Sequence, residues 1–298
     1  MAFLKSLVVA LIGASAANAS FGSRKANLKA RGIDMDTKLA KRASQPSRPV
    51  PNTYLNNKTQ PYWVNGSALP EVDFNIGESY SGLLPIDNTK ELFFWFVPST
   101  NPAAKDEITI WLNGESILRI DTQFDSNECI GGPGCSSLDG FFHENGPVIW
   151  QAGTYRPVPN TFAWNNLTNM VFIEQPVGTG FSQGTPNATN EIDVANQFLP
   201  FWRNFMDLFG LHGRKVYVTG ESYAGQYCPY ITDAMIQKNN TKYYNVQGMM
   251  IYDPSIQYEL ASQVAAVPFI DAHRPDFPFN DTFSDYIHNK SKACVSHP

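Results

Sequence analysis

The hexapeptide Gly-Glu-Ser-Tyr-Ala-Gly at residues 220–225 constrains this chain more than any other stretch. The five residues before it, Lys-Val-Tyr-Val-Thr, are rich in β-branched and aromatic side chains and predict a buried strand. After it, Tyr227, Ile231 and Met235 recur at the spacing of a helix. The sequence therefore predicts a strand, a sharp turn that carries Ser222, and a helix.

This pattern is typical of the nucleophile turn of α/β-hydrolases, which exposes a serine hydroxyl at the end of the sheet. Gly220 tolerates a tight turn, and the small residues Ala224 and Gly225 let the helix approach the strand closely. The backbone N–H of Tyr223 would face an oxyanion formed at Ser222. Because a Gly-x-Ser-x-small match is common by chance, the assignment of Ser222 as nucleophile depends on the rest of the chain.

The remaining sequence alternates predicted strands with predicted helices, which indicates an α/β fold with a mostly parallel sheet. An apolar stripe at helical spacing predicts a packed helix over residues 192–209. Residues 257–298 are less regular, and we expect them to form excursions above the sheet. The predicted strands cover residues 80–84, 91–97, 108–112, 170–174, 215–219 and 246–251.

Residues 1–19 are typical of a secretory signal peptide, with a basic start, an apolar run and an Ala-Asn-Ala cleavage site. Residues 20–42 are basic and end in Lys-Arg, so they are either a pro-segment or a disordered leader. No stretch of about 18 apolar residues follows, and we expect no membrane span. Secretion is the expected destination, with vacuolar delivery as an alternative.

The chain has a formal net charge of −5, and the part after the basic leader is more acidic still, which disfavours a nucleic-acid partner. Four cysteines show no metal-site spacing; their disulfide pairing stays open, and no cofactor is expected. Because several sequons follow a signal peptide, we expect a glycoprotein. The sequons begin at Asn57, Asn65, Asn166, Asn187, Asn239, Asn280 and Asn289.

A second glycine-rich stretch, Gly-Gly-Pro-Gly-Cys-Ser-Ser at residues 131–137, follows an early predicted strand. An oxyanion hole needs backbone N–H groups with no side chain in the way, which glycines supply. Several motifs now occur in one order and together resemble the serine carboxypeptidases. They are Ile-Trp-Leu-Asn-Gly (110–114), Gly-Pro-Gly-Cys-Ser-Ser (132–137), Phe-His-Glu-Asn-Gly-Pro (142–147), Phe-Ile-Glu-Gln-Pro-Val-Gly (172–178), Gly-Phe-Ser (180–182) and residues 220–225.

This resemblance implies an α/β-hydrolase that removes the C-terminal residue of peptides through an acyl-enzyme, most actively at acidic pH. By position, Ser222 is the nucleophile, and the N–H groups of Tyr223 and Gly132 form the oxyanion hole. A further group, Asn113, Glu144 and Glu221, is expected to hydrogen-bond the terminal carboxylate of the substrate. Since two glutamates and a carboxylate cannot all be ionised cheaply in one site, one acid must stay protonated as a donor.

The chain departs from the family pattern in the oxyanion loop. The family runs Trp-Leu-Asn-Gly-Gly-Pro-Gly-Cys without a break, whereas residues 115–131 here separate Gly114 from Gly132. Both ends of this segment can be encoded with splice-site sequences, and its removal restores the family spacing in frame. We expect it to be unspliced intron sequence; as real protein, it should disturb both the carboxylate group and the oxyanion hole.

A serine hydrolase also needs a general base and an acid, and in α/β-hydrolases both follow the serine. No histidine or aspartate after Ser222 stands in a suitable context, so neither is assigned. Residues 43–298 are therefore expected to form an incomplete α/β-hydrolase domain that lacks its C-terminal strands and is inactive as it stands. Alternatives are an acyltransferase of the same fold, a lipase or esterase, and a non-catalytic fragment that binds C-terminal carboxylates. Leaving-residue preference and oligomeric state stay open.

Overall fold

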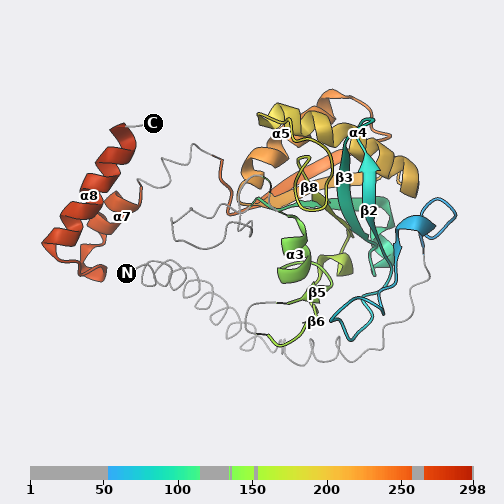
Figure 1. Ribbon diagram of the computed structural model, residues 1–298, viewed down its shortest axis with the longest axis horizontal. Coiled ribbons are helices and arrows are strands. Elements are labelled where there is room, and N and C mark those ends of the chain that lie inside the picture. The colour runs from blue at the N-terminus through green and yellow to red at the C-terminus, as the bar shows by residue number, and fades with distance from the viewer. Residues whose placement is uncertain (1–52, 115–133, 135, 151–153, 257–264, 297–298) are drawn as a thin grey trace. The chain divides into compact units, whose positions relative to one another are not determined.

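The computed structural model describes residues 53–114, 134, 136–150, 154–256 and 265–296. The expectations for residues 1–42 and 115–131, and for Gly132, concern parts of the chain outside these ranges. Figure 1 shows a central sheet with α4 and α5 on one side and α3 on the other. The sheet runs in the order β1-β2-β3-β7-β4-β8-β9.

The strands that surround the predicted turn are parallel: β4 pairs with β7 and β8, and β8 pairs with β9. The strands from β1 through β3 to β7 pair antiparallel. The predicted strands are all present, most of them one or two residues longer than expected. Their bounds are β1 Trp63–Val64, β2 Ser79–Pro85, β3 Glu91–Val97, β4 Glu107–Leu112, β7 Asn169–Glu174, β8 Lys215–Glu221 and β9 Val246–Tyr252.

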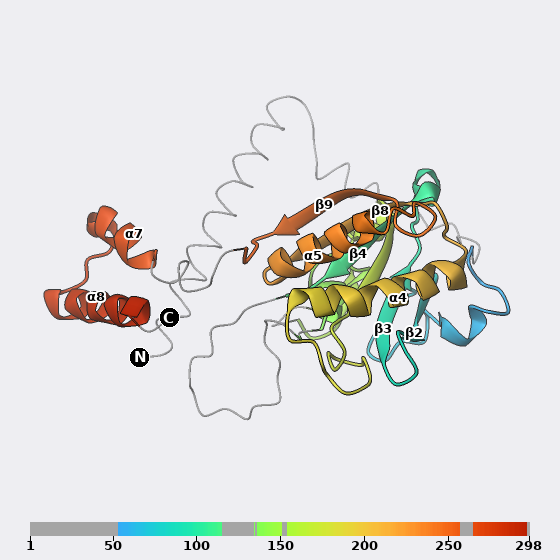
Figure 2. The same cartoon turned by 90° about the horizontal axis from the view of Figure 1, so that it is seen from above.

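One face of the sheet is covered by α4 (Glu191–Phe209) and α5 (Ala224–Gln237), which lie side by side in Figure 2. The predicted apolar stripe of α4 is buried, and Phe205 packs edge-on against Phe94 of β3 at 5.4 Å. The N-cap Asn190 accepts the Asp193 N–H, and Gly210 ends the helix in the left-handed conformation. Local capping and core packing therefore favour the same helix.

The opposite face carries a second apolar core, which holds α3 (Leu138–His143) on the sheet. Trp95 of β3 stacks on Phe141 of α3 with ring centroids 4.3 Å apart, and Phe141 also meets Phe172 of β7 edge-on. The described residues also form several short elements. They are β5 Val148–Ile149, β6 Val158–Pro159 and the 3₁₀ turns η1 Gln60–Tyr62, η2 Pro102–Asp106 and η3 Trp164–Asn166.

The expectation that residues 257–298 are irregular is wrong for the described part of that segment. It forms α7 (Ala266–Ala272), a turn η4 (Arg274–Asp276) and α8 (Asp281–Ser296). The Asn280 side chain accepts the Phe283 N–H at 2.9 Å, which satisfies a free donor at the start of α8. Ring contacts between Phe279, Phe283 and Tyr286 then favour the first turns of that helix.

No helix in the described ranges has both the length and the apolar character needed to cross a membrane. The asparagine of every predicted sequon is exposed, which is the accessibility that glycosylation requires. Cys228, in α5, is buried and unpaired, and burial raises the pKa of its thiol to about 12.

Candidate active site

Ser222 lies at the turn between β8 and α5, where the sequence predicts it. Its φ angle is +56°, a left-handed conformation that is uncommon for any residue other than glycine. The Ser222 N–H donates to the Tyr252 carbonyl at 3.0 Å, and the Ser222 carbonyl accepts the Ser255 N–H at 2.8 Å. These two bonds hold a strained backbone in place, which is typical of a functional turn.

The glycines on either side of Ser222 are required by close packing. A Cβ atom at Gly220 would lie 2.3 Å from the Leu112 carbonyl oxygen of the neighbouring strand. A Cβ atom at Gly225 would lie 2.6 Å from the Ser255 carbonyl oxygen. A Cβ atom at Gly220 of β8 would also lie 2.6 Å from the Cβ atom of Ala224 in α5, so the close approach of strand and helix that the sequence predicts is observed.

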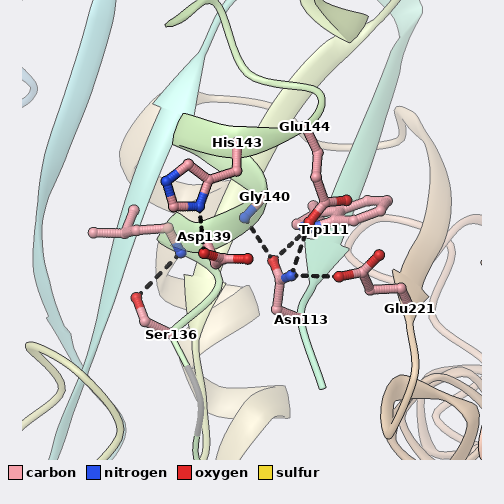
Figure 3. Close-up of polar contacts among 9 residues, drawn as sticks. Trp111, Asn113, Ser136, Asp139, Gly140, His143, Glu144 and Glu221 are labelled. Atoms are coloured by element: carbon pink, nitrogen blue, oxygen red, sulfur yellow. Dashed lines mark hydrogen bonds and ion pairs between the residues drawn. The ribbon is translucent and has the colours of Figure 1, made fainter. Parts of the chain in front are cut away.

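Asn113 connects the polar groups beside this turn (Figure 3). Its side-chain amide donates to Glu221 at 2.9 Å and to Glu144 at 3.3 Å. Its side-chain oxygen accepts the Trp111 indole N–H at 2.6 Å and the Gly140 N–H at 3.1 Å. These four contacts fix the orientation of the amide, with its NH₂ group toward the two carboxyl groups. We call Asn113, Glu144 and Glu221 the carboxyl cluster.

The sheet explains why residues so distant in the sequence meet here. Leu112 of β4 pairs with Gly220 of β8 in a parallel register, so Asn113, which follows β4, and Glu221, the last residue of β8, lie at the same edge of the sheet. Glu144 reaches the same place from the C-terminal end of α3. Asn113 itself is buried, whereas both glutamates are half-buried.

Burial raises the pKa of the Glu144 carboxyl above its ordinary value, and the nearby Asp139 carboxylate acts in the same direction. Hydrogen bonds from Glu221 and Asn113 oppose this rise without cancelling it. A carboxyl group with a raised pKa keeps its proton to a higher pH than an ordinary glutamic acid, and while protonated it can donate a hydrogen bond. The carboxyl cluster can therefore offer an O–H donor and an amide donor to an incoming anion.

The Tyr223 N–H, the predicted oxyanion donor, donates to the carbonyl of Gly114. Gly114 is tightly packed, since a Cβ atom there would lie 2.4 Å from the Ala224 nitrogen. An oxyanion at Ser222 would have to displace this carbonyl to reach the Tyr223 N–H. The other predicted donor, Gly132, lies outside the described residues. The roles of both residues stay predictions.

Sequence reasoning missed the residues that hold Asn113 in place. Trp111 and Gly140 bind its side-chain oxygen, and the Ser137 hydroxyl accepts its backbone N–H at 3.1 Å. Glycine is required at position 140, because a Cβ atom there would lie 2.2 Å from the Trp111 indole nitrogen. The available signal was the motif itself, in which Trp111 precedes Asn113 by two residues and so lies on the same face of the strand.

The described residues contain no group of three or more histidine, cysteine, aspartate or glutamate side chains that could hold a metal ion. The described part of the site offers a hydroxyl group at Ser222, an amide at Asn113 and two carboxyl groups at Glu144 and Glu221.

The sequence profile of the serine carboxypeptidase family matches residues 70–115 and 129–276, more than half of the chain. A probable serine carboxypeptidase of Arthroderma benhamiae is 53% identical over 255 residues, which is 80% of this chain and 45% of the relative. The serine-type carboxypeptidase F of Aspergillus niger is 45% identical over 246 residues, 81% of this chain and 43% of the relative. The chain thus spans less than half the length of these two curated relatives.

The crystal structure of Kex1, a prohormone-processing carboxypeptidase of Saccharomyces cerevisiae, superposes with a TM-score of 0.63 and 25% sequence identity. The match covers 80% of this chain and 52% of the Kex1 chain. This confirms the α/β-hydrolase fold predicted from the Ser222 turn. Together, the profile, the relatives and the fold show that the chain belongs to the serine carboxypeptidase family.

Proposed function

We propose that this protein removes the C-terminal residue of peptides, with Ser222 as nucleophile and the carboxyl cluster as the site that holds the terminal carboxylate. The observation that carries the proposal is the position of the cluster beside the serine turn, at the same edge of the sheet. A peptide bound there by its terminal carboxylate would place its last peptide bond near Ser222. Binding energy at the carboxylate would then position the carbonyl for attack.

In this reaction the Ser222 hydroxyl attacks the carbonyl carbon and releases the C-terminal amino acid, which leaves an acyl-serine. Water then attacks the acyl-serine and regenerates the hydroxyl group. Both steps need a base to accept a proton and an acid to return it. No described residue is assigned to these roles. The proposal draws on two features of the described residues, the Ser222 turn and the carboxyl cluster.

The contact between Tyr223 and Gly114 favours a second candidate function, in which the chain binds C-terminal carboxylates without cleaving them. An oxyanion hole whose donor is already bonded to a carbonyl gives no stabilisation until that carbonyl moves. The carboxyl cluster does not depend on this donor and would still bind the substrate end of a peptide.

One assay separates the two functions. The purified protein is incubated at mildly acidic pH with an N-terminally blocked peptide and with the amide of the same peptide. The peptidase proposal predicts release of the C-terminal amino acid from the free acid and much slower release from the amide. Binding of the free acid without release would support the carboxylate-binding function. Failure to bind the free acid in preference to the amide would contradict both.

We also infer that residues 115–131 do not belong to the native domain. In support, the two segments that match the family profile stop at residue 115 and resume at residue 129. A transcript sequenced across the codons for Asn113 to Pro133 should lack the codons for these residues. A main transcript that retains them would contradict the inference, and the oxyanion loop would then be interrupted in the expressed protein.

The expected route of the protein follows from its leader and sequons. The signal-like residues 1–19 and the basic residues 20–42, taken as a candidate pro-segment, support export to the cell exterior or delivery to the vacuole. The exposure of all seven sequon asparagines supports glycosylation in the secretory pathway. Peptides are the proposed partners.

A further inference from the structure

Glu174 is a fully buried acid that the proposed reaction does not use. It ends β7, between β3 and β4 in the sheet, and its relative exposure is 0%. A buried carboxyl group is costly unless it is hydrogen-bonded, so its partners indicate what keeps it there.

Two donors contact this carboxyl group from opposite loops. The Ser136 hydroxyl donates to one of its oxygens, and the Phe181 backbone N–H donates to the other. Gly180 lies directly against the group, because a Cβ atom there would come within 2.2 Å of both carboxyl oxygens. Burial raises the pKa of Glu174, and the two donors act against this rise. Glu174 therefore joins the loop before α3 to the loop after β7.

The contact with Ser136 leads directly to α3. The Ser136 oxygen also accepts the Leu138 N–H at 3.2 Å, at the first residue of the helix (Figure 3). Since the N-cap residue Ser137 makes no side-chain bond of the usual capping kind, Ser136 supplies the side-chain acceptor for this helix start.

The same helix sets the geometry of the carboxyl cluster. The Gly140 N–H in α3 binds the side-chain oxygen of Asn113, and the Ser137 hydroxyl accepts the Asn113 backbone N–H. The residue that follows the helix, its C-cap Glu144, accepts a hydrogen bond from the Asn113 amide. A shift of the first turn of α3 would therefore move three of the contacts around Asn113 together.

The geometry points to Glu174 as a positioning residue for the carboxyl cluster: through Ser136 it fixes the start of α3, and thereby the placement of Gly140 and Glu144 against Asn113. This inference rests on the proposed function, because it assigns Glu174 a part in carboxylate recognition. It extends the site to a residue that does not touch the substrate.

The test measures affinity, so it does not depend on turnover by the chain. Dissociation constants for a fluorescent peptide and for its C-terminal amide are measured at mildly acidic pH. Glu174→Gln keeps the volume of the side chain but can accept only one of the two hydrogen bonds. The preference for the free acid over the amide should fall by about 5-fold to 10-fold, as expected when a hydrogen bond to a charged ligand is weakened but not removed. Affinity for the amide should change by less than about 2-fold.

Variants at Ser136 test the same connection from its other end. Ser136→Ala should lower the preference for the free acid as Glu174→Gln does. Ser136→Thr keeps the hydroxyl group and should retain the preference. A matched control is Glu78→Gln, since Glu78 accepts bonds from the Thr53 and Tyr54 N–H groups and the Tyr80 hydroxyl, outside the cluster. That control should leave the preference unchanged. Thermal melts identify any variant that does not fold.

The outcomes separate this inference from the function on which it rests. If the unmodified protein does not prefer the free acid, the proposed function fails. If it does prefer the free acid, and folded Glu174→Gln and Ser136→Ala proteins keep that preference, the positioning role is overturned. Should Glu174→Gln not fold, the comparison of Ser136→Ala with Ser136→Thr decides the question alone.

Discussion

Replacing Ser222 by alanine should abolish release of C-terminal residues and leave peptide affinity almost unchanged. A nucleophilic serine forms the covalent intermediate, and its removal in a serine protease costs about a million-fold in kcat. The carboxyl cluster does not include the serine hydroxyl, so binding of the terminal carboxylate should persist. Mass spectrometry follows the release of amino acids, and fluorescence anisotropy gives the affinity for the peptide. The comparison is made with unmodified protein that releases the C-terminal amino acid in the same assay.

A matched control is Ser99→Ala, which removes a hydroxyl that donates to the Asn165 carbonyl and lies outside the site. This variant should keep its peptidase activity. Ser222→Gly should be inactive but more stable than the unmodified protein by about 1 kcal/mol, because glycine adopts the φ angle of +56° without strain. Residual release by purified Ser222→Ala would show that a different residue is the nucleophile.

The second large effect concerns pH. Affinity for a free C-terminal carboxylate should be greatest at mildly acidic pH and fall as the pH rises. The pKa of Glu144 is raised in the folded protein, so its carboxyl stays protonated above its ordinary pKa of 4.5, where a free glutamic acid would be ionised. As the pH rises through that raised value, the O–H donor is lost and the negative charge of the Glu144 carboxylate faces the ligand.

The acidic limit has a different origin. The terminal carboxylate of a peptide is itself protonated below about pH 3.5, and it then accepts hydrogen bonds less strongly. The preference for free acid over amide should therefore pass through a maximum between these two limits. Its size should be about 10-fold to 100-fold, the usual worth of a hydrogen bond to a charged group. Binding of the amide, which stays uncharged, should vary little over the same range.

The central fold was predictable because its signals are local and strong. The run of β-branched residues before Ser222 indicated β8, and the apolar stripe over residues 192–209 indicated α4; both were found. The small residues Ala224 and Gly225 indicated a close approach of helix and strand, and the structure contains it where Gly220 of β8 faces Ala224 of α5. The helix α8 was not predicted. It depends on a single polar cap at Asn280 and a few exposed aromatic rings, and these give only a weak apolar pattern in the sequence.

The members of the candidate site were named from the family motifs, whereas its geometry needed the structure. Nothing in the sequence indicates that the Gly114 carbonyl bonds to the Tyr223 N–H, because the two residues meet only through the pairing of β4 with β8. The part played by Glu174 was missed for a similar reason. As the last residue of a predicted buried strand, it gave no sign that it contacts Ser136 across the sheet edge.

The most direct test is the pH dependence of the preference for a free C-terminal carboxylate over its amide. Dissociation constants for both peptides are measured from about pH 4.5 to about pH 8, a range that spans the titration of a carboxyl with a raised pKa. The Asn113→Ala variant serves as the reference that lacks the cluster. The protein should prefer the free acid at the acidic end and lose most of that preference toward the basic end, while Asn113→Ala shows none throughout. A preference that is absent, or that stays constant or grows as the pH rises, would contradict recognition of the carboxylate by a protonated carboxyl group.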